Sequence, residues 1–200
     1  MKRPYSLIIL FLMALICACG KVGSSGNSSD ATDGRSLTGK QEKKEVNWKN
    51  EARNKYRILA EYYNNNVHDS LVMMLPEVLD FCREHELWTD YYDTWMLLGE
   101  EYSFSGEPDK AIEVVQEIHD DATKRGNKYG LTAAEFIKGL VYDGQANYKE
   151  AAQSFESALT NYPANGDPFQ KNSIYVYYLT ELKNLKDAEK MRKTLDEWKA

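Results

Sequence analysis

The chain has 200 residues, of which 42% are hydrophobic and 12% aromatic, and its formal net charge is −6 at pH 7. This length allows one domain with a hydrophobic core and a tail, and the apolar content excludes a wholly disordered chain. Acidic and basic residues are mixed along the sequence, and without a basic stripe we expect no nucleic-acid partner.

Residues 1–18 have the pattern of a signal peptide. Lys2 and Arg3 precede an unbroken apolar run of twelve residues at 7–18. A membrane-spanning helix needs roughly 20 apolar residues, whereas the core of a signal peptide needs about 7–15. The run therefore predicts a cleaved leader, with a retained short anchor as an alternative.

The leader ends in Ile16-Cys17-Ala18-Cys19. This stretch resembles the lipobox of bacterial lipoproteins, which implies cleavage before Cys19 and a diacylglycerol group on its sulfur. The resemblance further implies lipid anchoring in the bacterial cell envelope, facing the periplasm or exposed on the outer membrane. An ordinary secretory signal that happens to end in cysteines is the competing interpretation.

Residues 19–46 are predicted to form a flexible linker. Positions 20–39 are mostly Gly, Ser, Asn, Asp and Thr, and such a segment buries too little apolar surface to fold. We therefore expect the folded domain to cover 47–200. Its one cysteine, Cys82, lies in the apolar stretch "VLDFCREH", which predicts a buried side chain rather than a reactive thiol. With no other cysteine in the domain and no paired His/Cys spacing, we expect no disulfide, metal or other cofactor.

The folded domain contains internal repeats. Two segments share one pattern of spaced residues, which are Trp95, Leu98, Gly99, Tyr102, Ala111 and Val115 in the first and Gly139, Tyr142, Ala151, Phe155 and Pro163 in the second. They resemble the tetratricopeptide repeat signature W-x2-LG-x2-Y…A-x3-F…P, although Glu135 and Lys138 replace the tryptophan and leucine of the second copy. The resemblance implies an all-α, right-handed superhelical solenoid of antiparallel helix pairs.

Two weaker copies complete the expected array. Upstream, Ala60-x2-Tyr63 is similar to Gly99-x2-Tyr102, and downstream Leu185-x2-Ala188 is similar to Tyr148-x2-Ala151. These matches predict a repeat of 37 to 40 residues and four helix pairs near 49–85, 90–124, 128–161 and 168–199. A generic bundle of amphipathic helices is the alternative.

Several residues predict where helices end and where they approach one another. Gly106-Glu107-Pro108 and Asp167-Pro168 are expected to separate helices, with each proline in a first turn, and Pro76 is expected to kink or delay its helix. The small residues Gly99, Ala111, Gly139 and Ala151 are predicted where the two helices of a pair meet. Tyr102 and Tyr142 are predicted to lie between one repeat and the next.

The sequence predicts binding rather than catalysis. His68, His85 and His119 have no nucleophile or paired carboxylate at a suitable spacing, and no phosphate-binding glycine loop is present. In the resembling family the first helix of each pair lines a concave groove. Its positions here are Asn54, Arg57, Glu61, Asn64, Asp93, Met96, Glu100, Phe104, Phe136, Leu140, Asp143, Ser173 and Tyr177. This apolar and acidic set predicts a protein or peptide partner with basic and aromatic anchors, although plain solvated surface is the alternative for each residue.

The C-terminal helix ends in an apolar stripe of Met191, Leu195 and Trp198. In the isolated chain Trp198 is expected to reach only the preceding helix, near Ile174, Tyr178 and Leu179. Part of the stripe would then stay exposed, which predicts either fraying or a homodimer through this helix.

Over its mature length the chain also resembles the extracytoplasmic repeat region of bacterial two-component sensor kinases and regulators. The shared motifs are "YYDTW", "GNKYGL" and "A-x3-F-x2-AL". Three functions are therefore open: a non-catalytic interaction scaffold of the envelope, a sensory region that is truncated or acts in trans, and an accessory lipoprotein for glycan or nutrient uptake.

Overall fold

A computed structural model describes residues 36–199, and their side chains from Asn47 on with the exception of Phe169. This part of the chain is folded into α-helices and short turns, which confirms the predicted all-α class. The predicted signal peptide, Cys19 and the first part of the linker lie outside the described residues.

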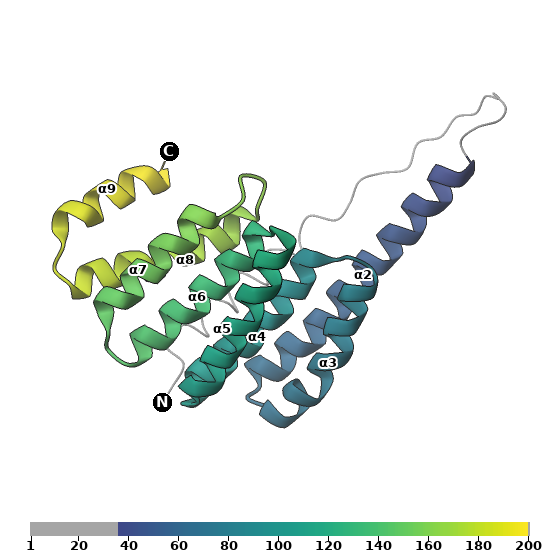
Figure 1. The fold of residues 1–200 in the computed structure, drawn as a ribbon, viewed down its shortest axis with the longest axis horizontal. Helices are drawn as coiled ribbons and strands as arrows, with labels where there is room; N and C mark the ends of the chain where they lie inside the picture. The colour runs from purple at the N-terminus through teal and green to yellow at the C-terminus, as the bar shows by residue number, and fades with distance from the viewer. Residues whose placement is uncertain (1–35, 200) are drawn as a thin grey trace. The chain divides into compact units, whose positions relative to one another are not determined.

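Eight helices follow one another over the described part of the chain (Figure 1). They are α2 (Ser36–Asn64), α3 (His68–Glu84), α4 (Trp88–Ser105), α5 (Pro108–Arg125), α6 (Lys128–Gly144), α7 (Tyr148–Asn161), α8 (Pro168–Asn184) and α9 (Ala188–Lys199). Helices α3 to α9 pack sequentially, each against the next, and α4 also packs against α6. The predicted pairs α4/α5, α6/α7 and α8/α9 are thereby confirmed, and in the first pair Lys55 of α2 bonds to Glu77 of α3 at 2.6 Å.

The first pair starts earlier than expected. Helix α2 begins at Ser36, so the last eleven residues assigned to the linker, 36–46, are helical. The physical reason is a change in composition, because 40–45 reads KQEKKE and consists of good helix formers. By contacts, residues 52–200 form one compact unit, and all packing described below lies within it.

The repeat has a constant length that the sequence comparison did not detect. Helices α3 to α9 begin at His68, Trp88, Pro108, Lys128, Tyr148, Pro168 and Ala188, which are 20 residues apart. Left-handed residues occur two positions before six of these starts, at Asn66, Glu86, Gly106, Gly126, Ala146 and Lys186, with φ between 55° and 84°. The repeat is therefore a helix pair of 40 residues.

This spacing corrects the register of the last repeat. Ala188 is the first residue of α9 and is exposed, as Tyr148 is the first residue of α7. The equivalent of the fully buried Ala151 is therefore Met191, forty residues later, and the match of Ala188 to Ala151 was wrong. The boundary predictions are confirmed, since α5 begins at Pro108 after the left-handed Gly106 and α8 begins at Pro168.

The small residues are buried, but they do not all serve the same contact. A Cβ on Gly139 would lie 2.5 Å from the ring of Phe155 on α7, within the pair as predicted. A Cβ on Gly99 would lie 2.5 Å from Ile137 on α6, so Gly99 packs against the next repeat and not within its own pair. Ala111, like Ala151, has no exposed surface.

Two further predictions about helices have clear outcomes. Pro76 does not delay α3, which begins eight residues before it and continues through it. Because Pro76 is exposed, its ring lies on the outer side of the helix. Tyr102 lies 5.9 Å from the ring of His68 on α3, between repeats as predicted.

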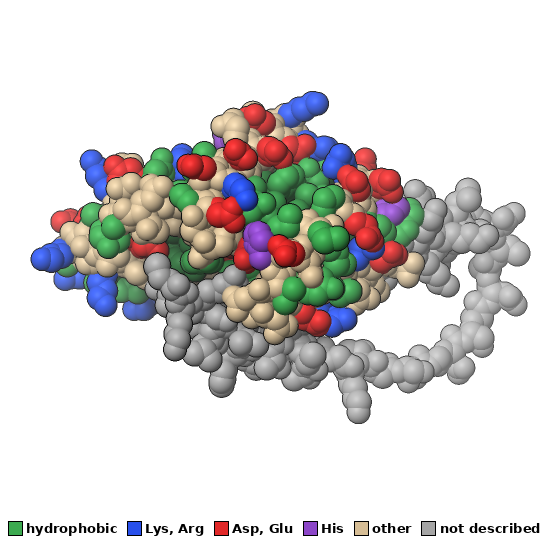
Figure 2. Space-filling view, turned by 90° about the horizontal axis from the view of Figure 1, so that it is seen from below, with side chains coloured by type: hydrophobic (Ala, Val, Ile, Leu, Met, Phe, Trp, Pro, Cys, Tyr) green, Lys and Arg blue, Asp and Glu red, His purple; other side chains and the backbone are tan. Residues whose placement is uncertain are grey.

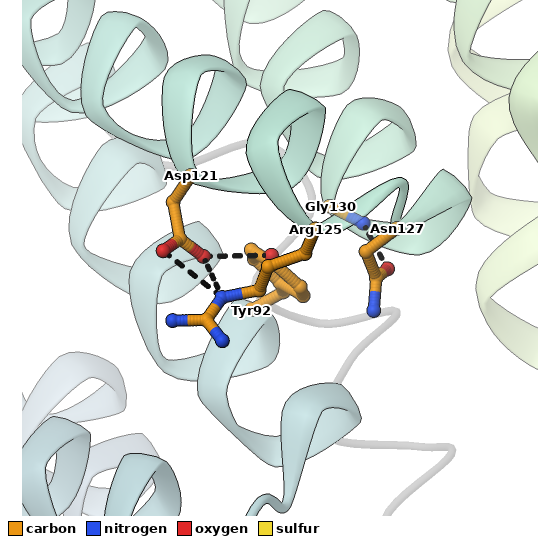
Figure 3. Close-up of polar contacts among 5 residues, drawn as sticks. All are labelled: Tyr92, Asp121, Arg125, Asn127 and Gly130. Atoms are coloured by element: carbon orange, nitrogen blue, oxygen red, sulfur yellow. Dashed lines mark hydrogen bonds and ion pairs between the residues drawn. The ribbon is translucent and has the colours of Figure 1, made fainter.

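Polar contacts hold α4 to α5 and cap the start of α6 (Figure 3). The hydroxyl of Tyr92 on α4 donates to Asp121 on α5 at 2.8 Å, and Arg125 donates to the same carboxylate. The side chain of Asn127 accepts a hydrogen bond from the backbone N–H of Gly130 and caps the start of α6. These contacts fix the turn that leads into the third repeat.

The C-terminal helix packs on α8 through its tryptophan. The ring of Trp198 stacks on that of Tyr175 at 5.7 Å, and its indole N–H donates to Oδ1 of Asn172 at 2.7 Å. The contact with α8 was expected, and the ring stacking and the hydrogen bond are made to Tyr175 and Asn172, which had not been named from the sequence. Met191, Leu195 and Trp198 are half-buried, and the homodimer stays a prediction. Among the described helices, none combines the length and apolar character needed to cross a membrane.

Candidate interaction face on the first helices

The predicted groove residues all lie on α2, α4, α6 and α8, the first helices of the four pairs. Asn54, Arg57 and Glu61 are exposed on α2, where Arg57 pairs with Glu61 at 2.6 Å. The half-buried members are Asn64, Asp93, Glu100, Phe104, Asp143, Ser173 and Tyr177. We call the surface that carries these exposed and half-buried residues the first-helix face.

Three predicted residues are less accessible than a groove requires. Met96, Phe136 and Leu140 have exposed fractions of 6%, 5% and 3%. Phe136 packs in an aromatic cluster with Phe155 and Tyr177, with ring distances of 5.9 and 5.4 Å. Their apolar character therefore reflects packing between helices, so we remove them from the candidate contact residues.

A hydrogen-bonded bridge ties three first helices together. The hydroxyl of Tyr129 on α6 donates to Asp93 on α4 and also contacts the side-chain oxygen of Gln170 on α8. The amide nitrogen of Gln170 in turn lies 3.5 Å from the sulfur of Met96. The bridge spans three successive repeats, so it fixes the spacing of their first helices at this point.

The carboxyl group of this bridge is unusually basic. Burial raises the pKa of Asp93 to about 7, with smaller contributions from the negative charges of Asp90 and Asp167. The hydrogen bonds of Tyr129 and Gln170 oppose this increase. Near neutral pH both protonation states are therefore populated, and a nearby cation would favour the charged one.

Tyrosines surround this acidic position. Tyr56 on α2 has a raised pKa because of burial and because Asp93, Glu100 and Asp90 lie nearby. The ring of Tyr162 stands edge-on to Tyr129 at 6.3 Å, and burial raises the pKa of Tyr162 to about 12. Protonated tyrosines beside carboxylates provide donors, acceptors and ring faces, all of which suit a guanidinium or ammonium group.

Sequence reasoning found Asp93 and Glu100 but missed Tyr56, Tyr129, Tyr162 and Gln170. The sequence held one signal for two of these residues, which is their spacing. Tyr129 follows Asp93 by 36 residues and Gln170 follows Tyr129 by 41, and both intervals are close to one repeat length. Such residues lie at similar heights on neighbouring first helices.

A pair of acidic side chains, Asp143 on α6 and Glu181 on α8, connects these two helices. Glu181 has no exposed surface, and its Oε2 accepts a hydrogen bond from the side chain of Asn184 at 3.4 Å. Burial and, secondly, the negative charge of Asp143 together raise the pKa of Glu181 to about 7. The pKa of Asp143 is likewise raised, first by burial. The two carboxyl groups are stable together when one of them carries a proton.

The described residues offer no cluster of three or more His, Cys, Asp or Glu side chains that could hold a metal ion. Cys82 is fully buried as predicted, and burial raises the pKa of its thiol to about 12. A thiol with that pKa stays protonated at neutral pH and is a poor nucleophile.

Stacked antiparallel helix pairs of constant length define a helical repeat protein. Residues 136–165, which run from the middle of α6 through α7, match the family model of the tetratricopeptide repeat. This segment is therefore a tetratricopeptide repeat, and repeats of this kind are generally scaffolds for protein–protein interaction. No significant match to a curated protein or to a solved structure was found.

Proposed function

We propose that the chain is a non-catalytic interaction scaffold whose first-helix face binds a peptide segment that carries basic side chains. The observation that carries this proposal is the bridge between Asp93, Tyr129 and Gln170. It places a carboxyl group of raised pKa among tyrosines on a face shared by successive repeats.

The charge of this face supports a basic partner. Asp93 and Glu100 come from α4 and Asp143 comes from α6, and all three are half-buried on this face. A guanidinium or ammonium group that approaches Asp93 would stabilise its ionised form and replace the water lost on burial. Burial of an arginine or lysine anchor next to tyrosine rings adds cation–π attraction.

The proposal is tested by measuring binding of an extended Arg- and Tyr-containing peptide to the folded chain by fluorescence anisotropy. Glu100→Lys is expected to weaken binding at least tenfold, because it places a cation on the first-helix face. Glu150→Lys makes the same change in charge on exposed α7 and should alter affinity less than twofold. Equal effects of the two variants would contradict the assignment of this face.

The pH dependence offers a second measurement. The basic peptide should bind more tightly as the pH rises through about 7, since Asp93 then loses its proton. Asp93→Asn should remove this increase while it keeps the shape of the side chain. If the pH profile is unchanged by Asp93→Asn, another group controls binding.

We further propose that the scaffold is held at the bacterial cell envelope by a lipid on Cys19. This proposal is supported by the apolar run and by Ile16-Cys17-Ala18-Cys19 in the sequence. When cells that express the protein are grown with labelled palmitate, the protein should become labelled. The Cys19→Ala variant should carry no label and should keep its leader. Label retained in Cys19→Ala would exclude this anchor.

A further inference from the structure

A concave surface lies between α3 and α4, where the first repeat meets the second. It is a hollow of about 300 Å³ lined by Val72, Leu75, Pro76, Leu79, Asp80, Arg83, Trp95 and Leu98. Six of these eight side chains are apolar, and the two charged ones pair with each other at 2.9 Å. None of the residues proposed for the first-helix face lines this hollow.

We propose that this hollow is a docking site for an amphipathic helix of a partner protein, with large apolar anchors on one face and basic side chains beside them. This inference goes beyond the peptide-binding function proposed above, because it concerns a different surface and a different form of partner.

The shape of the wall favours a helix. The residues that α3 contributes are spaced three and four apart from Val72 to Arg83, so they form one ridge along the helix. At 1.5 Å per residue this ridge is about 17 Å long. Ridges of this kind pack against a further helix, and helices offer no free backbone edge to an added strand.

The floor provides places for anchoring side chains. Trp95 is half-buried and Pro76 is exposed, whereas Leu75 and Leu79 are 3% and 5% exposed. The hollow therefore has an apolar floor and an accessible aromatic wall. Its volume lies at the lower end of binding pockets, which start at about 300 Å³, so it suits one or two large anchors.

The charge around the hollow selects a basic partner. Helix α3, which forms most of the wall, carries four acidic and one basic side chain. On the face seen in Figure 2, hydrophobic side chains gather in one area that is bordered by both acidic and basic side chains. Arg83 is neutralised by Asp80 and Glu77 pairs with Lys55 of α2, while Asp69 and Glu84, which precede and follow the lining residues of α3, are exposed. Basic side chains flanking an apolar helix face complement this arrangement.

The test uses a fluorescein-labelled 16-residue peptide with leucines spaced three and four apart and lysines on the flanks, titrated with the folded chain. The double variant Pro76→Lys/Asp80→Lys adds two cations at exposed positions of the hollow and should weaken binding at least tenfold. The control Val176→Lys/Glu150→Lys makes the same total change in charge at exposed positions of α8 and α7 and should change affinity less than twofold.

A third variant separates this inference from the proposed function. Asp93→Asn/Glu100→Gln alters the first-helix face and should leave binding of the helical peptide unchanged. If this variant abolishes binding while the hollow variant does not, the peptide occupies the first-helix face and the inference is wrong, whereas the proposed function stands. Equal loss in the hollow and control variants, or no binding to the unsubstituted chain, would also overturn the docking site.

Discussion

Gly99 of α4 and Ile137 of α6 are in direct contact across the boundary between the second and third repeats. A Cβ on Gly99 would lie 2.5 Å from Cδ1 of Ile137 and 2.8 Å from its two other branch carbons. Because Ile137 has no exposed surface, it has no free space into which it could move. The absence of a side chain at position 99 therefore sets how closely two first helices approach.

We expect Gly99→Leu to lower the free energy of unfolding by about 1–3 kcal/mol, because the added side chain overpacks the contact with Ile137. Urea denaturation measures this change. Gly144→Ala is the control, since no atom lies within 4 Å of a Cβ at that position. Combining Gly99→Ala with Ile137→Val should recover part of the loss of Gly99→Ala, and strictly additive effects would show that the two residues are not coupled.

Ala146 occupies a left-handed position between α6 and α7, with φ 59°. This conformation destabilises a residue with a Cβ by about 1–2 kcal/mol. A glycine avoids that strain, but it lowers stability by about 0.4–1 kcal/mol because it increases the conformational entropy of the unfolded chain. Ala146→Gly should therefore raise the free energy of unfolding, and Gly106→Ala at φ 84° should lower it. Thermal unfolding of both variants tests this, and a shift in the same direction for both would contradict the turn geometry.

The folded protein should lose stability as Glu181 loses its proton. The ordinary pKa of 4.5 applies in the unfolded chain, and the folded pKa is about 7, so the folded state binds the proton more tightly. Stability associated with Glu181 is then fully present below pH 4.5 and lost as the pH rises through 7. Glu181→Gln should raise the melting temperature at pH 8 more than at pH 5, whereas Glu189→Gln on exposed α9 should show no such difference. An equal effect of Glu181→Gln at both pH values would mean that Glu181 is ionised throughout this range.

The attachment of α9 should depend on Trp198. Trp198→Ala removes the stacking on Tyr175 and the hydrogen bond to Asn172, so amide hydrogens of α9 should exchange faster. Exchange in α4 and α5 should not change, because α9 packs on α8 and reaches α7 through the ion pair of Lys190 with Glu156. Lys199→Ala, at an exposed position, is the matched control. Unchanged protection of α9 in Trp198→Ala would mean that other contacts hold the helix.

Much of the helix pattern could be read from the sequence because it depends on local signals. Gly106 followed by Pro108, and Asp167 followed by Pro168, mark helix ends through backbone conformations that each residue favours. The register of the last repeat was predicted wrongly because Met191 occupies the position that Ala151 occupies one repeat earlier. Since methionine does not resemble alanine, the match was made to Ala188 instead. The start of α2 was missed because the Gly- and Ser-rich composition was extended past Lys40 into good helix formers.

The sequence by itself determined that this protein is an array of paired helices, because amphipathic periods, small residues and turn residues act within a few positions of one another. Only the tertiary structure decided the constant 20-residue spacing, since the left-handed positions from Asn66 to Lys186 repeat a conformation and not a residue type. It also decided the candidate site. Asp93, Tyr129 and Gln170 belong to three different repeats, and the burial that raises the pKa of Asp93 arises only when their helices are stacked.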